Sequence, residues 1–151
     1  MWHFVHIPKT GGSSIEKALN IPPIHQFASQ TERPRFTIVR HPLDRLISAW
    51  EFSRFRGTVM DEELNEQALR KFLNLDNVMV VRQTTWVDGE MDFIGRFETL
   101  EQDFAKISDL PLPHMCATER KDWRAYFTPE TLAYATAFYL SDFKTFGYEE
   151  P

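Results

Sequence analysis

The chain has 151 residues, 42% of them hydrophobic and 26% charged, which is typical of one globular domain and excludes a disordered or fibrous protein. Its formal net charge of −5 argues against a general nucleic-acid binder, although a small anionic ligand responds to local charge instead. No apolar run approaches the ~20 residues that cross a bilayer, so neither nucleic acid nor membrane is an expected partner.

The single cysteine, Cys116, cannot form an internal disulfide or a thiolate metal cluster. We expect it to be a small buried or half-buried apolar side chain. A reducing compartment fits this cysteine usage, and no signal peptide is visible, so a cytoplasmic location is expected.

The first half of the chain predicts strands that alternate with helices. Residues 2–7 form a short apolar strand, and the glycines that follow lead into a helix that ends at Pro22 and Pro23. A brief strand is predicted at 24–28 and a clearly buried one at 36–39. A helix follows from Leu43, and another is predicted near 61–74.

The second half continues this alternation. Residues 78–81 are either a strand or an extended loop, and 93–97 are a third good strand that leads into a helix capped by Thr99. Residues 110–124 are predicted to be a loop, and Thr128-Pro129-Glu130 begins the last helical region. We therefore predict an α/β fold with a single parallel sheet flanked by helices, in one domain over residues 1–151.

The stretch HIPKTGGSSIEKAL, residues 6–19, joins the first strand to the first helix through a glycine-containing loop. Such a loop offers backbone N–H groups and the positive end of a helix dipole to an anion. Gly11 and Gly12 permit close approach, Ser13 and Ser14 add hydroxyl groups, and Lys9 supplies a full charge. We interpret this stretch as a phosphate-binding loop, against the alternative of a Gly-Gly turn with a solvated lysine.

This loop is not a Walker A motif, because that motif places lysine after the last glycine and directly before Ser or Thr. Arg40 also stands at the end of its strand, in the position where a magnesium-binding aspartate would be expected. No metal is therefore predicted.

The stretch FTIVRHPLDRLISAW, residues 36–50, carries a second candidate site. Arg40 leaves the end of a strand and Ser48 lies on the following helix, so a guanidinium and a hydroxyl are available to a second phosphate. The alternative is that Arg40 pairs with a carboxylate such as Asp44, while Ser48 faces water.

Together, these two stretches resemble the donor-binding signatures of sulfotransferases that use 3′-phosphoadenosine 5′-phosphosulfate (PAPS). The chain is most similar to the carbohydrate branch with the heparan sulfate 2-O- and chondroitin-type enzymes. The segments DFIGRFETLEQDF at 92–104 and YFTPETLAYATAFYLSDFKTFGYEE at 126–150 also fit. The resemblance implies a P-loop-NTPase-like sulfotransferase fold.

The resemblance also implies roles for the two motifs. The loop residues would hold the 5′-phosphosulfate, with Lys9 on the bridging oxygen, while Arg40 and Ser48 would bind the 3′-phosphate. The full set of loop residues is Lys9, Thr10, Gly11, Gly12, Ser13 and Ser14. Lys121 and Arg124, in a polar loop, are further candidates for the 3′-phosphate, and Trp123 is a candidate to shield the adenine.

Sulfuryl transfer to a hydroxyl is helped by a general base. His25 lies in the segment that matches the base-bearing segment of the 2-O-sulfotransferases, and histidine titrates near neutrality. Glu51, Asp88 and Glu98 are the acidic rivals, so the choice of base stays open at this point. His6 is expected to pack at the end of the first strand.

We therefore predict a sulfotransferase that acts on a hydroxyl acceptor, either a small molecule or a saccharide. Gln83 and Trp86 are candidates to line the acceptor cleft. Two alternatives stay open, a nucleotide kinase-like phosphotransferase and a non-catalytic nucleotide-binding module. The sequence specifies neither the acceptor nor the oligomeric state.

Overall fold

The computed structural model describes residues 1–61, 63–115 and 119–151, so Cys116 lies outside the described residues. The chain divides into two compact units. Unit 1 comprises Met1–Arg40 and Gln83–Ala117, and unit 2 comprises His41–Arg82 and Thr118–Pro151. Each unit is described by itself, and the expectation of one domain stays a prediction.

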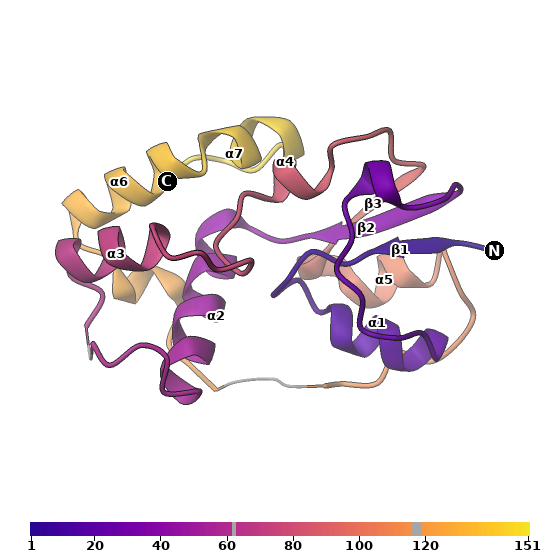
Figure 1. The fold of residues 1–151 in the computed structure, drawn as a ribbon, viewed down its shortest axis with the longest axis horizontal. Helices are drawn as coiled ribbons and strands as arrows, with labels where there is room; N and C mark the ends of the chain where they lie inside the picture. The colour runs from indigo at the N-terminus through magenta and orange to yellow at the C-terminus, as the bar shows by residue number, and fades with distance from the viewer. Residues whose placement is uncertain (62, 116–118) are drawn as a thin grey trace. The chain divides into compact units, whose positions relative to one another are not determined.

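Unit 1 contains a parallel sheet whose strands lie in the order β1 (His3–Val5), β2 (Arg35–Val39) and β3 (Phe93–Arg96) (Figure 1). Phe36 pairs with Phe4 on one side and with Phe93 on the other, and the central strand is buried along its whole length. The predicted strands at 2–7, 36–39 and 93–97 and the predicted parallel sheet are therefore confirmed.

Helices α1 (Gly12–Leu19) and α5 (Leu100–Phe104) share a core cluster with one face of this sheet. Ile15 of α1 and Phe104 of α5 are buried in that cluster together with Phe36 and Ile38 of β2. Because side chains alternate along a strand, Arg35 points to the opposite face. There it donates hydrogen bonds to backbone carbonyls around a 3-10 turn at Ala28–Gln30.

Unit 2 is helical, with α2 (Pro42–Phe55), α3 (Glu66–Leu73), α6 (Pro129–Phe138) and α7 (Leu140–Phe146). Their apolar faces meet in one core that includes Trp50, Phe72, Tyr139 and Phe143. The Tyr139 hydroxyl donates a 2.7 Å hydrogen bond to the carbonyl of Val80 in that core. Thr128 caps α6 by accepting from the Thr131 N–H at 3.3 Å, which confirms the predicted helix start.

The structure differs from the predicted elements at several points. Residues 24–28 form no strand, because they follow two prolines and pair with no neighbouring strand. Residues 78–81, predicted to be either a strand or an extended loop, form a turn, and a short helix, α4 (Gln83–Trp86), follows them. The last helical region breaks at Tyr139, which has φ −99° and ψ 17°. Within the described part of the chain, no helix is both long and apolar enough to cross a membrane.

Candidate active site

The loop after β1 has an unusual backbone at two positions. Lys9 has φ +69° and Gly11 has φ +88°, so both lie in the left-handed region. That conformation strains a residue with a Cβ, and it costs lysine roughly 1–2 kcal/mol. The Thr10 hydroxyl donates to the Ile7 carbonyl at 2.8 Å and is buried, so it holds the turn itself. The chain then enters α1 at Gly12, and the N–H groups of the first turn lie beside Lys9 in sequence.

We call residues 9–14 the donor loop, after the role that the sequence predicts for them. A side chain is disfavoured at both of its glycines, at Gly12 because the His6 ring occupies the space of a Cβ and at Gly11 because φ is positive. A Cβ at Gly12 would lie 2.1 Å from Nε2 of His6, and one at Gly11 would lie 2.9 Å from Cδ2 of Leu100. The two serines differ in exposure. Ser13 is exposed, whereas Ser14 is buried and its Oγ accepts a hydrogen bond from the Met115 N–H at 3.3 Å.

Arg40 follows the last residue of β2, at the same edge of the sheet as the donor loop. Its Nη1 donates to the Lys9 carbonyl at 3.1 Å, and its guanidinium carbon lies 3.9 Å from the centroid of the Phe97 ring. The side chain of Gln83 fixes the Arg40 backbone, accepting from its N–H at 2.9 Å and donating to its carbonyl at 2.8 Å. The structure thus brings the two predicted motifs together at Lys9 and Arg40.

His25 lies in an exposed segment, but its ring is held. Its Nδ1 lies 3.1 Å from the His6 carbonyl, and its ring centroid lies 4.3 Å from that of His6. A carbonyl only accepts, so Nδ1 of His25 carries the proton and Nε2 keeps its lone pair in the neutral ring. This tautomer suits a general base that acts through Nε2.

His6 forms a buried pair with an acid. Its Nδ1 lies 2.5 Å from Oε1 of Glu16 on α1, and the two side chains are 8% and 9% exposed. Burial, and secondarily the charge of His25, lowers the pKa of His6 to about 3. Burial also raises the pKa of Glu16, while His25 opposes this shift. His6 is therefore neutral at physiological pH. The expectation that it packs at the strand end is confirmed.

The acidic rivals of His25 have partners of their own. In unit 1, Asp88 accepts from the backbone N–H and the hydroxyl of Ser29 at 2.7 and 2.5 Å, and these bonds lower the pKa of Asp88. A lowered pKa makes it a weaker base. In unit 2, Glu51 accepts from Arg54 at 3.1 Å. Glu98 lies in the 3-10 turn Phe97–Thr99 of unit 1 with an exposed side chain.

The remaining predicted donor-binding residues belong to unit 2. Ser48 lies on α2 and is half-buried, and Lys121 is exposed. Arg124 stacks on Trp123, with its guanidinium carbon 4.4 Å from the ring centroid, and pairs with Asp122. The roles of Ser48, Lys121 and Arg124 stay predictions.

Two expectations, one for Trp123 in unit 2 and one for Gln83 in unit 1, need correction or refinement. Trp123 is only 7% exposed and stacks on His41 at 4.7 Å between ring centroids, so its ring fills the core of unit 2. Gln83 is fully buried and pairs with the Arg40 backbone, so the expectation that it lines an open acceptor cleft is wrong. Asp44, considered as a partner for Arg40, forms an ion pair with Arg120.

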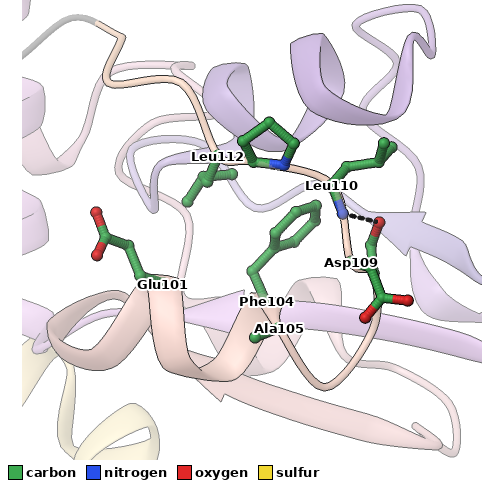
Figure 2. A pocket seen from close by; sticks show the side chains of 8 residues that line it. Glu101, Phe104, Ala105, Asp109, Leu110 and Leu112 are labelled. Carbon is green, nitrogen blue, oxygen red and sulfur yellow. Dashed lines mark hydrogen bonds between the residues drawn. The ribbon is translucent and has the colours of Figure 1, made fainter.

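A hollow of about 420 Å³ lies elsewhere in unit 1, between the end of α5 and the segment that follows it (Figure 2). The Phe104 ring lies in its middle, and Glu101 and Asp109 lie at its two sides. None of the predicted site residues lines it. Among the residues the structure describes, no cluster of three or more His, Cys, Asp or Glu side chains is arranged to hold a metal ion.

The site contains two features that the sequence did not reveal. Glu16 was not recognised as the partner of His6, although the two are only ten residues apart. Gln83 and Arg40 are separated by 43 residues, and no local pattern indicates their pairing. The one available signal for the His6 partner was a glutamic acid four residues after the first glycine of an amphipathic helix, on the side that faces the sheet.

The protein family to which the chain belongs follows from a comparison with models of known families. The family described as the sulfotransferase family matches residues 3–149. The chain belongs to the sulfotransferase family. Comparisons with curated proteins and with solved structures gave no match. The parallel α/β sheet agrees with the predicted sulfotransferase fold, and sulfuryl transfer is the class of activity of this sulfotransferase.

Proposed function

We propose that this sulfotransferase moves the sulfuryl group of PAPS to a hydroxyl group of a small-molecule or saccharide acceptor. The observation that supports this most directly is the hydrogen bond from Arg40 to the Lys9 carbonyl at 3.1 Å. It joins, at the carboxyl edge of one parallel sheet, the two motifs that resemble donor-binding signatures. Ligands of such sheets bind at that edge.

The donor loop has the chemistry that a phosphosulfate requires. The N-terminus of α1 and the Lys9 ammonium both favour an anion. In the proposal, Lys9, Thr10, Gly11, Gly12, Ser13 and Ser14 hold the 5′-phosphosulfate. Arg40 contacts the 3′-phosphate, while Ser48, Lys121 and Arg124 stay sequence-based candidates for that phosphate. A guanidinium has five N–H donors, so Arg40 can serve both Lys9 and a phosphate.

The residues of the chain have separate tasks in the transfer. His25 takes the acceptor's proton through Nε2 as the acceptor oxygen bonds to sulfur. Lys9 balances the negative charge left on the bridging oxygen when the sulfur–oxygen bond breaks and adenosine 3′,5′-bisphosphate departs. No metal is required for this charge balance.

Thermal unfolding tests the donor assignment. A ligand at 100 times its dissociation constant stabilises a protein by about 2.7 kcal/mol, so adenosine 3′,5′-bisphosphate should raise the Tm clearly. ADP, and ATP with magnesium, should raise it less. Lys9→Ala and Arg40→Ala should abolish the shift, whereas Lys17→Ala, on the exposed side of α1, should keep it. Stabilisation by magnesium-ATP alone would favour a phosphotransferase instead.

Turnover distinguishes an enzyme from a nucleotide-binding module. With PAPS and a panel of neutral and acidic saccharides and phenols, mass spectrometry should detect a sulfated product. His25→Ala should abolish product formation and leave bisphosphate binding unchanged. If the bisphosphate binds and no hydroxyl in the panel is sulfated, the result would favour the nucleotide-binding module over the enzyme.

A further inference from the structure

The His6–Glu16 pair is buried in unit 1, beneath the donor loop. The 2.5 Å distance between Nδ1 and Oε1 places one proton between them. The His6 ring also stacks on Phe4, with centroids 5.4 Å apart. A buried polar pair contributes little stability compared with an apolar pair of similar volume, so stability is a poor reason for its presence.

The His6 ring contacts α1 at two points that lie one turn apart. The His6 imidazole fills the space where a Gly12 side chain would lie, since a Cβ there would be 2.1 Å from Nε2 and 2.2 Å from Cδ2. Its Nδ1 reaches Glu16, four residues further along the same helix face. Two contacts from one rigid ring fix both the position and the rotation of the first turn of α1 relative to the end of β1. The donor loop spans that interval.

His6 also holds the candidate base, His25. The His6 carbonyl accepts from Nδ1 of His25 at 3.1 Å, and the two rings lie 4.3 Å apart. Movement of the His6 backbone or ring would therefore release His25, and with it the tautomer that leaves Nε2 available.

We propose that His6 and Glu16 are a positioning pair, which sets the donor loop through the first turns of α1 and orients His25 through the His6 carbonyl. The proposal rests on the proposed function, in which the loop binds the donor and His25 is the base. Neither His6 nor Glu16 contacts the reacting atoms. Because His6 is neutral, the pair acts by hydrogen bonding and shape, so neutral variants that keep the hydrogen bond should keep the effect.

Three variants separate positioning from stability. His6→Asn keeps an amide N–H donor near the place of Nδ1, and so keeps a partner for Glu16. The double variant His6→Leu with Glu16→Leu replaces the pair by apolar side chains and should be at least as stable as the wild type. Glu16→Ala removes the partner alone. The matched control is His114→Leu, because His114 and Glu101 form a similar pair at 3.2 Å that is exposed.

Two measurements are made on each variant: the Kd for adenosine 3′,5′-bisphosphate by calorimetry and the His25 tautomer by ¹⁵N NMR of labelled histidine. We expect the double-leucine variant to bind the bisphosphate about tenfold more weakly, the effect of one lost hydrogen bond to a charged group. Its His25 should lose the Nδ1–H tautomer. Glu16→Ala should behave similarly, and His6→Asn should stay within about threefold of the wild type.

Wild-type affinity and an unchanged His25 tautomer in a folded double-leucine or Glu16→Ala variant would overturn the proposal. A similar loss of affinity in His114→Leu would overturn it as well, because the effect would not be specific to the buried pair. Failure of the proposed function is distinguishable. In that case, wild-type protein does not bind the bisphosphate at all, while the tautomer of His25 still reports whether His6 orients it.

Discussion

The Arg40 guanidinium donates a hydrogen bond to the Lys9 carbonyl at 3.1 Å, which ties the end of β2 to the loop that follows β1. The same guanidinium stacks on Phe97, just beyond the end of β3. One side chain therefore connects all three strand ends. This gives Arg40 a structural role in addition to the proposed contact with the 3′-phosphate.

Arg40→Ala should accordingly lower both stability and donor affinity. Loss of a charged hydrogen bond and of the ring contact should cost about 2 kcal/mol in the free energy of unfolding, measured with urea. Arg40→Lys should recover little, since a lysine lacks the planar fork. The control is Arg56→Ala, because Arg56 is exposed and lies 5.8 Å from the Phe52 ring centroid. An equal loss in the free energy of unfolding for Arg56→Ala would contradict the structural role of Arg40.

Gly12→Ala should be strongly destabilising. The added Cβ would lie 2.1 Å from His6 Nε2, and the imidazole is held by Glu16 and cannot move aside freely. We expect a loss of about 3 kcal/mol, as for overpacked cores, together with weaker bisphosphate binding. Gly57→Ala is the matched comparison, because Gly57 has φ +69° and open space around it. It should cost about 1 kcal/mol and leave binding unchanged.

The stability of the protein should depend on pH through His6. Its pKa falls from 6.5 in the unfolded chain to about 3 in the folded one, so the unfolded state takes up a proton first as the pH drops. Stability from His6 is therefore present above pH 6.5 and is lost as the pH falls toward 3. Between pH 7 and pH 5 this loss should be about 2 kcal/mol.

His6→Asn isolates this contribution. The free energies of unfolding of wild type and variant are measured with urea at several pH values. The difference between them should shrink by that amount as the pH falls from 7 to 5. A constant difference over this range would mean that the folded and unfolded states take up the same number of protons, so that folding does not lower the pKa of His6.

Asp103→Asn should weaken the junction between β3 and α5. The Asp103 carboxylate accepts from the Arg96 N–H at 2.8 Å, the Thr99 hydroxyl at 2.7 Å and the Lys106 ammonium at 2.6 Å. Burial opposes ionisation, but these bonds outweigh it and lower the pKa of Asp103. An amide meets fewer of these donors, so the variant should lose about 2 kcal/mol at pH 7.

The sign of the pH effect gives a second check on Asp103. A lowered pKa means that its contribution is present above the unfolded value of 3.8 and is lost as the pH falls through the folded value. The cost of the substitution should therefore shrink in strong acid. Asp109→Asn, at an exposed position, should change stability by less than about 0.5 kcal/mol.

The sequence predicted the strands, the turn from the first strand into a helix and the place of Arg40 at the end of β2, because these depend on local patterns. Apolar runs before Pro8 and Arg40 indicated buried strands, and the glycines indicated a tight turn into a helix. The strand predicted at 24–28 failed for the complementary reason. Its β-forming residues have no neighbouring strand to pair with, and pairing rather than propensity decides whether a strand forms.

Long-range contacts in the site could not be predicted. The left-handed backbone of Lys9 is maintained by the fold around it, and the sequence marked only the glycines as suited to that conformation. The two hydrogen bonds between Gln83 and the Arg40 backbone join residues far apart in the chain. Such contacts follow from how the strands are ordered, which a local pattern does not specify.

The contact between Gly12 and the His6 ring has a consequence for how this chain can vary. A methyl group at position 12 and an imidazole at position 6 compete for the same space, so neither position is free to change by itself. A relative that carries alanine at position 12 should carry a smaller residue at position 6 and should have lost its need for an acid at position 16. These three positions are expected to be inherited as a set.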